Sequence, residues 1–137
     1  MSTDAHEIYR RYVGAMVLHG LHAARECGLG GTDMYALNLL DLNGPMTPGE
    51  LSAQTGLTTG PTTRLIDRLE AAGYVRRTPS PDDRRKVIVE PVGEPTELAE
   101  ALAPARQKLG EVFARYSEEE RRTLFDYFAR ATEALRP

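Results

Sequence analysis

The segment from Thr47 to Val89 constrains the fold of this chain more than any other part of its sequence. Thr47 can cap a helix, and Pro48 suits the first helical position, where its missing N–H has no intrahelical partner. Glu50 completes the pattern of a capping box. Gly56 follows soon after and is a typical residue to end a helix. The pattern therefore predicts a short helix that begins and ends abruptly.

A second helix is predicted to open at Thr58 and to close at Gly73. Pro61 falls in its first turn, where the helix tolerates a residue without an N–H. The apolar residues inside this helix recur at helical spacing. They are Leu65, Ile66 and Leu69.

A β-hairpin is predicted to follow these two helices. Tyr74–Arg77 and Lys86–Val89 are short β-prone runs, and the loop Thr78–Arg85 between them is charged and rich in turn residues. Two helices joined by a tight glycine turn and followed by a hairpin predict a winged helix-turn-helix. The predicted fold class is mostly α with a small β-hairpin wing.

Helices are also predicted on both sides of this segment. Residues from Thr3 to about Cys27 carry a broad apolar face, and a second helix capped by Thr32 or Asp33 runs to Asn43. After the hairpin the helical pattern resumes at Thr96. The run Ser117–Glu120 is a further capping box that opens a final helix.

The distribution of charge is more informative than its total. The formal net charge is −3, but the stretch from Arg64 to Lys86 holds seven basic and four acidic residues, a net +3, which leaves −6 for the remainder. A basic patch on an acidic body suits a protein that binds phosphates with one face only. A solvated charged face is the alternative interpretation of this stretch alone.

Within the winged motif, the second helix is expected to enter the major groove of DNA and the hairpin tip to reach a neighbouring minor groove. Hydroxyl groups can contact phosphates or base edges, and arginine can bind guanine bidentately. Asp67 is instead expected to pair locally with an arginine. The predicted DNA contacts are Thr58, Thr59, Thr62, Thr63, Arg64, Arg68, Asp83, Arg84 and Arg85.

The order and spacing of motifs over about residues 47 to 89 resemble those of MarR-type regulators. The motifs are Glu50-Leu51-Ser52, Thr55-Gly56-Leu57-Thr58, Thr63–Glu70, Gly73–Arg77 and Pro81-Asp82-Asp83-Arg84-Arg85. The resemblance implies an obligate homodimer, a palindromic operator, and often a small-molecule or oxidant signal that lowers DNA affinity. It also implies that Asp83 orients Arg85 at the wing, for which a charge-assisted hydrogen bond is the physical means.

Three departures from the family pattern bear on structure. Ser52 and Thr62 stand where the family usually has small or branched apolar residues, so either the two helices pack more loosely there or hydroxyl hydrogen bonds replace the apolar contact. Pro61 stiffens the start of the second helix of the motif. Glu90-Pro91-Val92 replaces the usual exit from the wing, which leaves the path into the next helix open.

The flanking helices carry more apolar surface than one small lobe can cover, which favours a shared dimer core, with packing on their own chain as the alternative. The predicted organisation is an N-terminal dimerisation helix (residues 1–31), a DNA-binding lobe (32–92) and C-terminal dimerisation helices (93–137). A pocket for a flat phenolic effector is expected between the dimerisation helices and the DNA-binding lobe, although plain core packing is the favoured explanation for each residue taken singly. Its candidate residues are Tyr12, Met16, His19 and Met34.

Other chemistry is expected to be absent. Cys27 is the only cysteine and is interpreted as a small packing residue rather than an oxidant sensor. His19 and His22 stand three residues apart, but without further ligands they do not predict a metal site. No cofactor is predicted. The lack of an apolar signal or membrane-spanning run favours a soluble cytoplasmic protein.

The sequence therefore predicts a homodimeric transcriptional repressor that binds double-stranded DNA sequence-specifically and responds to a small ligand. A winged-helix module that binds other proteins and not DNA is the alternative, and the basic tip Arg84-Arg85 argues against it. Phosphate-binding glycine loops and nucleophile–base motifs are missing, so an enzyme is not predicted.

Overall fold

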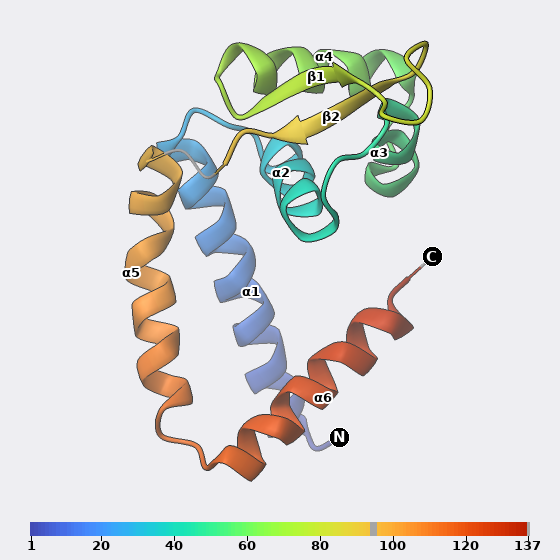
Figure 1. Ribbon diagram of the computed structural model, residues 1–137. Coiled ribbons are helices and arrows are strands. Elements are labelled where there is room, and N and C mark those ends of the chain that lie inside the picture. Colours follow the sequence, from blue (N-terminus) through green and yellow to red (C-terminus); the bar gives the residue numbers. More distant parts are fainter. Residues whose placement is uncertain (94–95, 137) are drawn as a thin grey trace. The chain divides into compact units, whose positions relative to one another are not determined.

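The computed structural model describes residues 1–93 and 96–136, and within them it contains six helices and one antiparallel hairpin (Figure 1). This agrees with the predicted fold class. The elements are α1 (Thr3–Glu26), α2 (Gly31–Asn43), α3 (Pro48–Thr55), α4 (Thr59–Ala71), β1 (Val75–Pro79), β2 (Val87–Pro91), α5 (Thr96–Phe113) and α6 (Glu118–Ala134).

The chain forms two compact units. The first comprises residues 1–101 and holds α1 to α4, the hairpin and the start of α5. The second begins at Leu102 and holds the rest of α5 together with α6. The predicted boundary after residue 31 falls at the first turn of α2, inside the first unit.

Local signals in the sequence explain most helix ends. The Thr47 hydroxyl accepts the Glu50 N–H at the start of α3, and Gly56 ends that helix at φ 75°. Ser117 and Glu120 form both bonds of a capping box at the start of α6. The prediction for α2 was wrong in detail, since this helix begins at Gly31 and neither Thr32 nor Asp33 caps it.

The core of the first unit lies between α2, α3, α4 and the hairpin. The inner face of α4 is apolar at helical spacing and is buried along its length. Met46, in the loop before α3, exchanges two backbone hydrogen bonds with Val89 of β2, at 2.7 and 3.1 Å. The largest fully buried side chains are Leu40, Leu51, Leu65, Ile66, Leu69 and Val89.

The hairpin pairs Val75 with Pro91 at its base and Pro79 with Val87 near its tip. Both strands begin one residue later than predicted and end two residues later than predicted. The loop from Ser80 to Lys86 closes with a hydrogen bond from the Ser80 N–H to the Lys86 carbonyl. The wing is therefore an ordered two-stranded element with a short tip.

In the second unit, aromatic packing joins α5 to α6. The rings of Phe113 and Phe125 stack with centroids 5.4 Å apart, and Phe128 meets Phe125 edge to face. The Arg121 guanidinium donates to the Phe113 carbonyl at 2.8 Å, which satisfies an acceptor at the end of α5. Within residues 1–93 and 96–136, no helix has both the length and the apolar character needed to cross a membrane.

Candidate nucleic-acid interface

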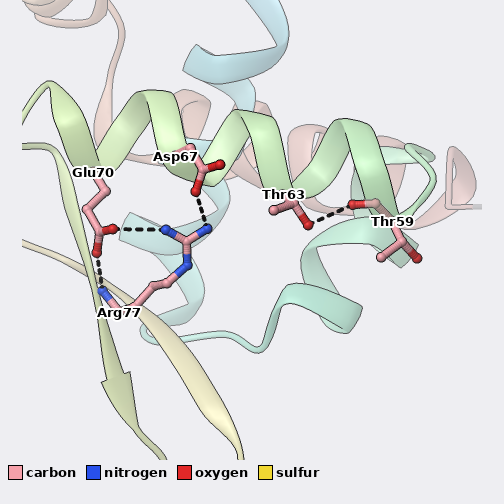
Figure 2. Close-up of polar contacts among 5 residues, drawn as sticks. All are labelled: Thr59, Thr63, Asp67, Glu70 and Arg77. Carbon is pink, nitrogen blue, oxygen red and sulfur yellow. Dashed lines mark hydrogen bonds and ion pairs between the residues drawn. The ribbon is translucent and has the colours of Figure 1, made fainter.

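The exposed face of α4 is the centre of the candidate interface. Opposite its buried apolar side, α4 exposes Thr59, Thr63, Arg64 and Asp67. On this face the Thr63 hydroxyl donates to the Thr59 carbonyl, and the Asp67 carboxylate accepts from the Arg77 guanidinium (Figure 2). The helix thus offers a polar surface on a rigid, well-anchored element.

The first turn of α4 is open to an anion. Thr58 is the N-cap residue, but its side chain makes no capping hydrogen bond. Pro61 occupies the third helical position and has no N–H to donate to it. The first-turn N–H groups of a helix have no intrahelical acceptor, so those of Thr59 and Gly60 can meet a phosphate oxygen.

Thr62, a predicted DNA contact, does not lie on the exposed face of α4. The residue is 2% exposed, and its hydroxyl donates to the Thr58 carbonyl at 2.8 Å. Ser52 likewise donates its hydroxyl to the Leu57 carbonyl. Both hydroxyl groups are therefore satisfied by hydrogen bonds to backbone carbonyls. Of the two alternatives for these positions, hydroxyl hydrogen bonds in place of apolar contact are the one observed. Burial removes Thr62 from the set of candidate contacts.

Arg64 extends back over the start of α4. A Cβ placed on Gly60 would lie 3.5 Å from Nη1 of Arg64, so the guanidinium runs along the first helical turn. This direction is typical of long helical side chains. Together with the open N–H groups, it concentrates positive potential at the N-terminal end of α4.

Arg68 is engaged within the protein. Its Nε and Nη2 donate to the two carboxylate oxygens of Asp33 at 3.2 and 2.8 Å. The Asp33 side chain is 7% exposed, and its hydrogen bonds raise the pKa of Arg68. This pair joins the first turn of α2 to the last turn of α4. Local patterns in the sequence could not predict this pair, because the two residues stand 35 positions apart.

Arg77 of β1 ties the wing to α4 (Figure 2). Its Nη2 lies 2.6 Å from Asp67 Oδ1, its Nη1 lies 2.9 Å from Glu70 Oε1, and its backbone N–H donates to Glu70 Oε2 at 2.9 Å. Burial lowers the pKa of Arg77, but these hydrogen bonds outweigh burial and leave the pKa raised. Asp67 pairs with an arginine as expected, but the partner is Arg77 of β1, ten positions along the chain, and not a neighbour on α4.

The wing tip presents an oriented arginine. Asp83 accepts hydrogen bonds from the Arg85 backbone N–H at 3.0 Å and from its Nε at 3.1 Å. These side-chain and backbone bonds hold the pKa of Asp83 below its ordinary value, so the carboxylate stays ionised at neutral pH. The Arg85 side chain is 91% exposed. The predicted Asp83–Arg85 pair is confirmed, with the guanidinium in reach of a ligand.

The basic stretch divides into paired and unpaired cations. Arg68, Arg76, Arg77 and Arg85 each have an acidic partner. Arg64, Arg84 and Lys86 have none among the described residues. These three side chains and the exposed Arg85 supply the positive charge of the interface. Sequence spacing alone could not show which of these cations are paired, because several of the acidic partners stand 10 or more positions away.

The candidate effector residues do not form a single enclosed group. Tyr12 and Met16 lie exposed one turn apart on α1, whereas His19 and Met34 are half-buried. Cys27 at the end of α1 is half-buried beside Tyr74. Burial and the neighbouring thiol raise the pKa of Tyr74. Across the described parts of the chain, no three His, Cys, Asp or Glu side chains are grouped as metal ligands.

Comparisons with known proteins agree with this geometry. A profile of the MarR family matches residues 28–86. The chain is 36% identical over 136 residues to the HTH-type transcriptional regulator YcgE of Bacillus subtilis, covering 98% of this chain and 88% of that protein.

Two solved structures extend the comparison to the fold. The transcriptional regulator Tm0710 of Thermotoga maritima is 27% identical with a TM-score of 0.67, over 97% of this chain and 95% of its own. Sco3205 of Streptomyces coelicolor, a MarR family regulator solved in complex with DNA, is 23% identical with a TM-score of 0.60. That match covers 100% of this chain and 91% of Sco3205.

Proposed function

Because this chain belongs to the MarR family of winged helix-turn-helix transcriptional regulators, we propose that it is a homodimeric repressor of a palindromic DNA operator. Family membership makes the chain a DNA-binding regulator and not an enzyme. The dimer, the repression and the response to a small ligand are the proposed refinements.

One observation carries the proposal: α4 and the wing tip present phosphate- and base-binding groups on two adjoining elements of a single unit. Arg64 and the open first turn of α4 suit the major groove. The oriented Arg85 suits the negative potential of a narrow minor groove. The proposed DNA contacts are Thr58, Thr59, Thr63, Arg64, Asp83, Arg84 and Arg85, with Asp83 acting through Arg85.

The exposed apolar residues of both units support a homodimer. On α1, Ile8 and Val17 are more than half exposed, and on α6 so are Phe125 and Tyr127. A monomer rarely leaves so many large apolar side chains in water. A two-fold dimer covers them and presents two copies of α4 to half-sites about 10 base pairs apart, which increases both affinity and specificity.

A small aromatic effector would act by a population shift. Tyr12 and Met16 offer aromatic and thioether surface on α1, and His19 and Met34 extend it in the proposed site. Such a ligand binds more tightly to a dimer whose two α4 helices do not match the half-site spacing, and so shifts the population toward that dimer. The free energy of DNA binding is weakened by at most the difference in the ligand's binding free energy between the two forms of the dimer.

Selection of bound DNA from a random pool tests this function. We expect recovery of a palindrome with two half-sites about one helical turn apart, bound by a protein whose native mass is that of a dimer. Repeating the selection with phenolic compounds should reveal one that reduces recovery. Binding of all sequences equally at every salt concentration would exclude a sequence-specific repressor.

The wing is expected to contribute strongly to affinity. Arg85→Ala should raise the Kd for the selected operator about 10- to 100-fold, because it removes an exposed guanidinium already oriented by Asp83. The slope of log Kd against log salt should fall by about 1 if this group neutralises one phosphate. Fluorescence anisotropy over a salt series measures both quantities.

Arg122→Ala is the matched control for the wing variant. Arg122 is also an exposed arginine paired with a nearby carboxylate, that of Glu118, but it lies outside the predicted DNA-binding lobe. Its Kd and salt slope should equal those of the parent protein. Equal affinities for the two variants would show that the wing does not contact the operator.

A further inference from the structure

We propose that Thr63 and Asp67 read the operator as hydrogen-bond acceptors, selecting bases that present an exocyclic amino group in the major groove. Cytosine N4 is the group expected opposite Asp67, and adenine N6 or cytosine N4 opposite Thr63. The inference rests on the proposed function, because it requires α4 to enter the groove. It assigns a base-reading role to an acidic residue that also has a partner within the protein.

The position of the two side chains is the first argument. Thr63 and Asp67 stand one helical turn apart on the exposed face of α4, in line with Thr59 (Figure 2). The Asp67 side chain is 59% exposed although it contacts Arg77. Pairing with Arg77 therefore leaves the Asp67 carboxylate accessible on the outer surface of the helix.

The hydroxyl of Thr63 has a defined polarity. It donates its proton to the Thr59 carbonyl at 3.0 Å. A hydroxyl carries one proton and two lone pairs, so its outward side can then only accept. Thr63 therefore favours a donor on the base edge and disfavours the carbonyl and ring-nitrogen acceptors of guanine.

Asp67 has one carboxylate oxygen to spare. Arg77 binds Oδ1 at 2.6 Å, and no donor among the described residues binds Oδ2. Glu70 directs both of its own oxygens at Arg77, which fixes the guanidinium in place. Arg77 thus offsets the negative charge that phosphates would otherwise repel, and leaves Oδ2 as an acceptor.

The donors and acceptors on base edges determine which bases two acceptor side chains can select. In the major groove only cytosine N4 and adenine N6 donate, whereas guanine N7 and O6 and thymine O4 accept. An acceptor facing an acceptor leaves both unpaired after desolvation. Arg64, also on the outer face, is the donor of this surface and suits guanine. The face is therefore built to read a half-site that contains both guanine and cytosine edges.

The test is selection from a random DNA pool with the full-length parent and variants, with unfolding midpoints measured for each. The parent should enrich cytosine at one symmetric position of the palindrome. Asp67→Asn should shift that position toward adenine, since asparagine can bind adenine N6 and N7 together. We expect the ratio of cytosine to adenine to change by roughly tenfold or more.

Two matched pairs separate base reading from structure. Thr63→Val keeps the branched shape and the methyl group but replaces the hydroxyl acceptor by a second methyl, and should relax the neighbouring position. Thr63→Ser keeps the acceptor and should retain the preference. Glu70→Gln alters the other partner of Arg77 and should leave the cytosine preference intact. A cytosine preference lost equally in Glu70→Gln and Asp67→Asn would overturn the inference, because positioning of Arg77 would then explain it.

The outcomes also separate this inference from the function on which it rests. If the parent protein recovers no palindrome, the proposed repressor function fails. If the parent recovers a palindrome and both Asp67→Asn and Thr63→Val select the same bases as the parent, the function stands and the acceptor role is wrong.

Discussion

Replacing Leu65 by alanine is expected to lower the free energy of unfolding by about 3 kcal/mol. Leu65 is 1% exposed on the inner face of α4, so truncation removes buried methyl groups and leaves a cavity that the surrounding helices fill only in part. Urea denaturation followed by circular dichroism, at one fixed protein concentration, measures the change.

Leu42→Ala provides the matched control for this core variant. Leu42 lies near the end of α2 and is 72% exposed, so the same substitution removes little buried surface. Its free energy of unfolding should stay within about 0.5 kcal/mol of the parent. Equal losses for Leu65→Ala and Leu42→Ala would mean that the inner face of α4 is not the core of the first unit.

The second large effect is expected at the Asp33–Arg68 pair. Arg68→Met should lower the free energy of unfolding by about 2 kcal/mol, because it leaves the buried Asp33 carboxylate without its two donors. The expected loss is smaller than for a fully buried pair, since the Arg68 side chain is 57% exposed and water screens its charge.

A double-mutant cycle with Asp33→Asn distinguishes this role from the DNA contact predicted for Arg68. An internal pair predicts a loss of stability for each single variant and a coupling free energy of about 1 kcal/mol or more. A phosphate contact instead predicts that Arg68→Met alone reduces the salt slope of DNA binding, by about 1, with no coupling to Asp33. Denaturation and anisotropy measurements on the same four proteins decide between them.

Much of the fold follows from local signals. Thr47, Gly56 and Ser117 set the ends of helices by bonds or backbone angles that involve only a few neighbouring residues. The alternation of buried and exposed positions along α4 follows from helical geometry. These features could be predicted because their causes lie within a few positions of one another.

The candidate site was predicted only in part, and the errors have one cause. Thr62 and Thr63 are adjacent and chemically identical, yet Thr62 is buried and Thr63 is exposed. The pattern of residue types grouped them, and only the packing of α4 on its neighbours separated them.

The predicted ends of the strands were also wrong, because the pairing of Pro91 with Val75 extends the hairpin beyond its β-prone run.

The sequence alone was enough to establish a winged helix-turn-helix and its basic stretch, because capping and periodicity act within a few residues. The Asp83–Arg85 wing pair was implied by the resemblance to MarR-type regulators. Tertiary structure was needed to show which cations are left to meet a ligand. Arg68 and Arg77 find their carboxylates only when α2, α4 and β1 come together. Ion pairing depends on distance in space, and folding sets that distance for residues far apart in the chain.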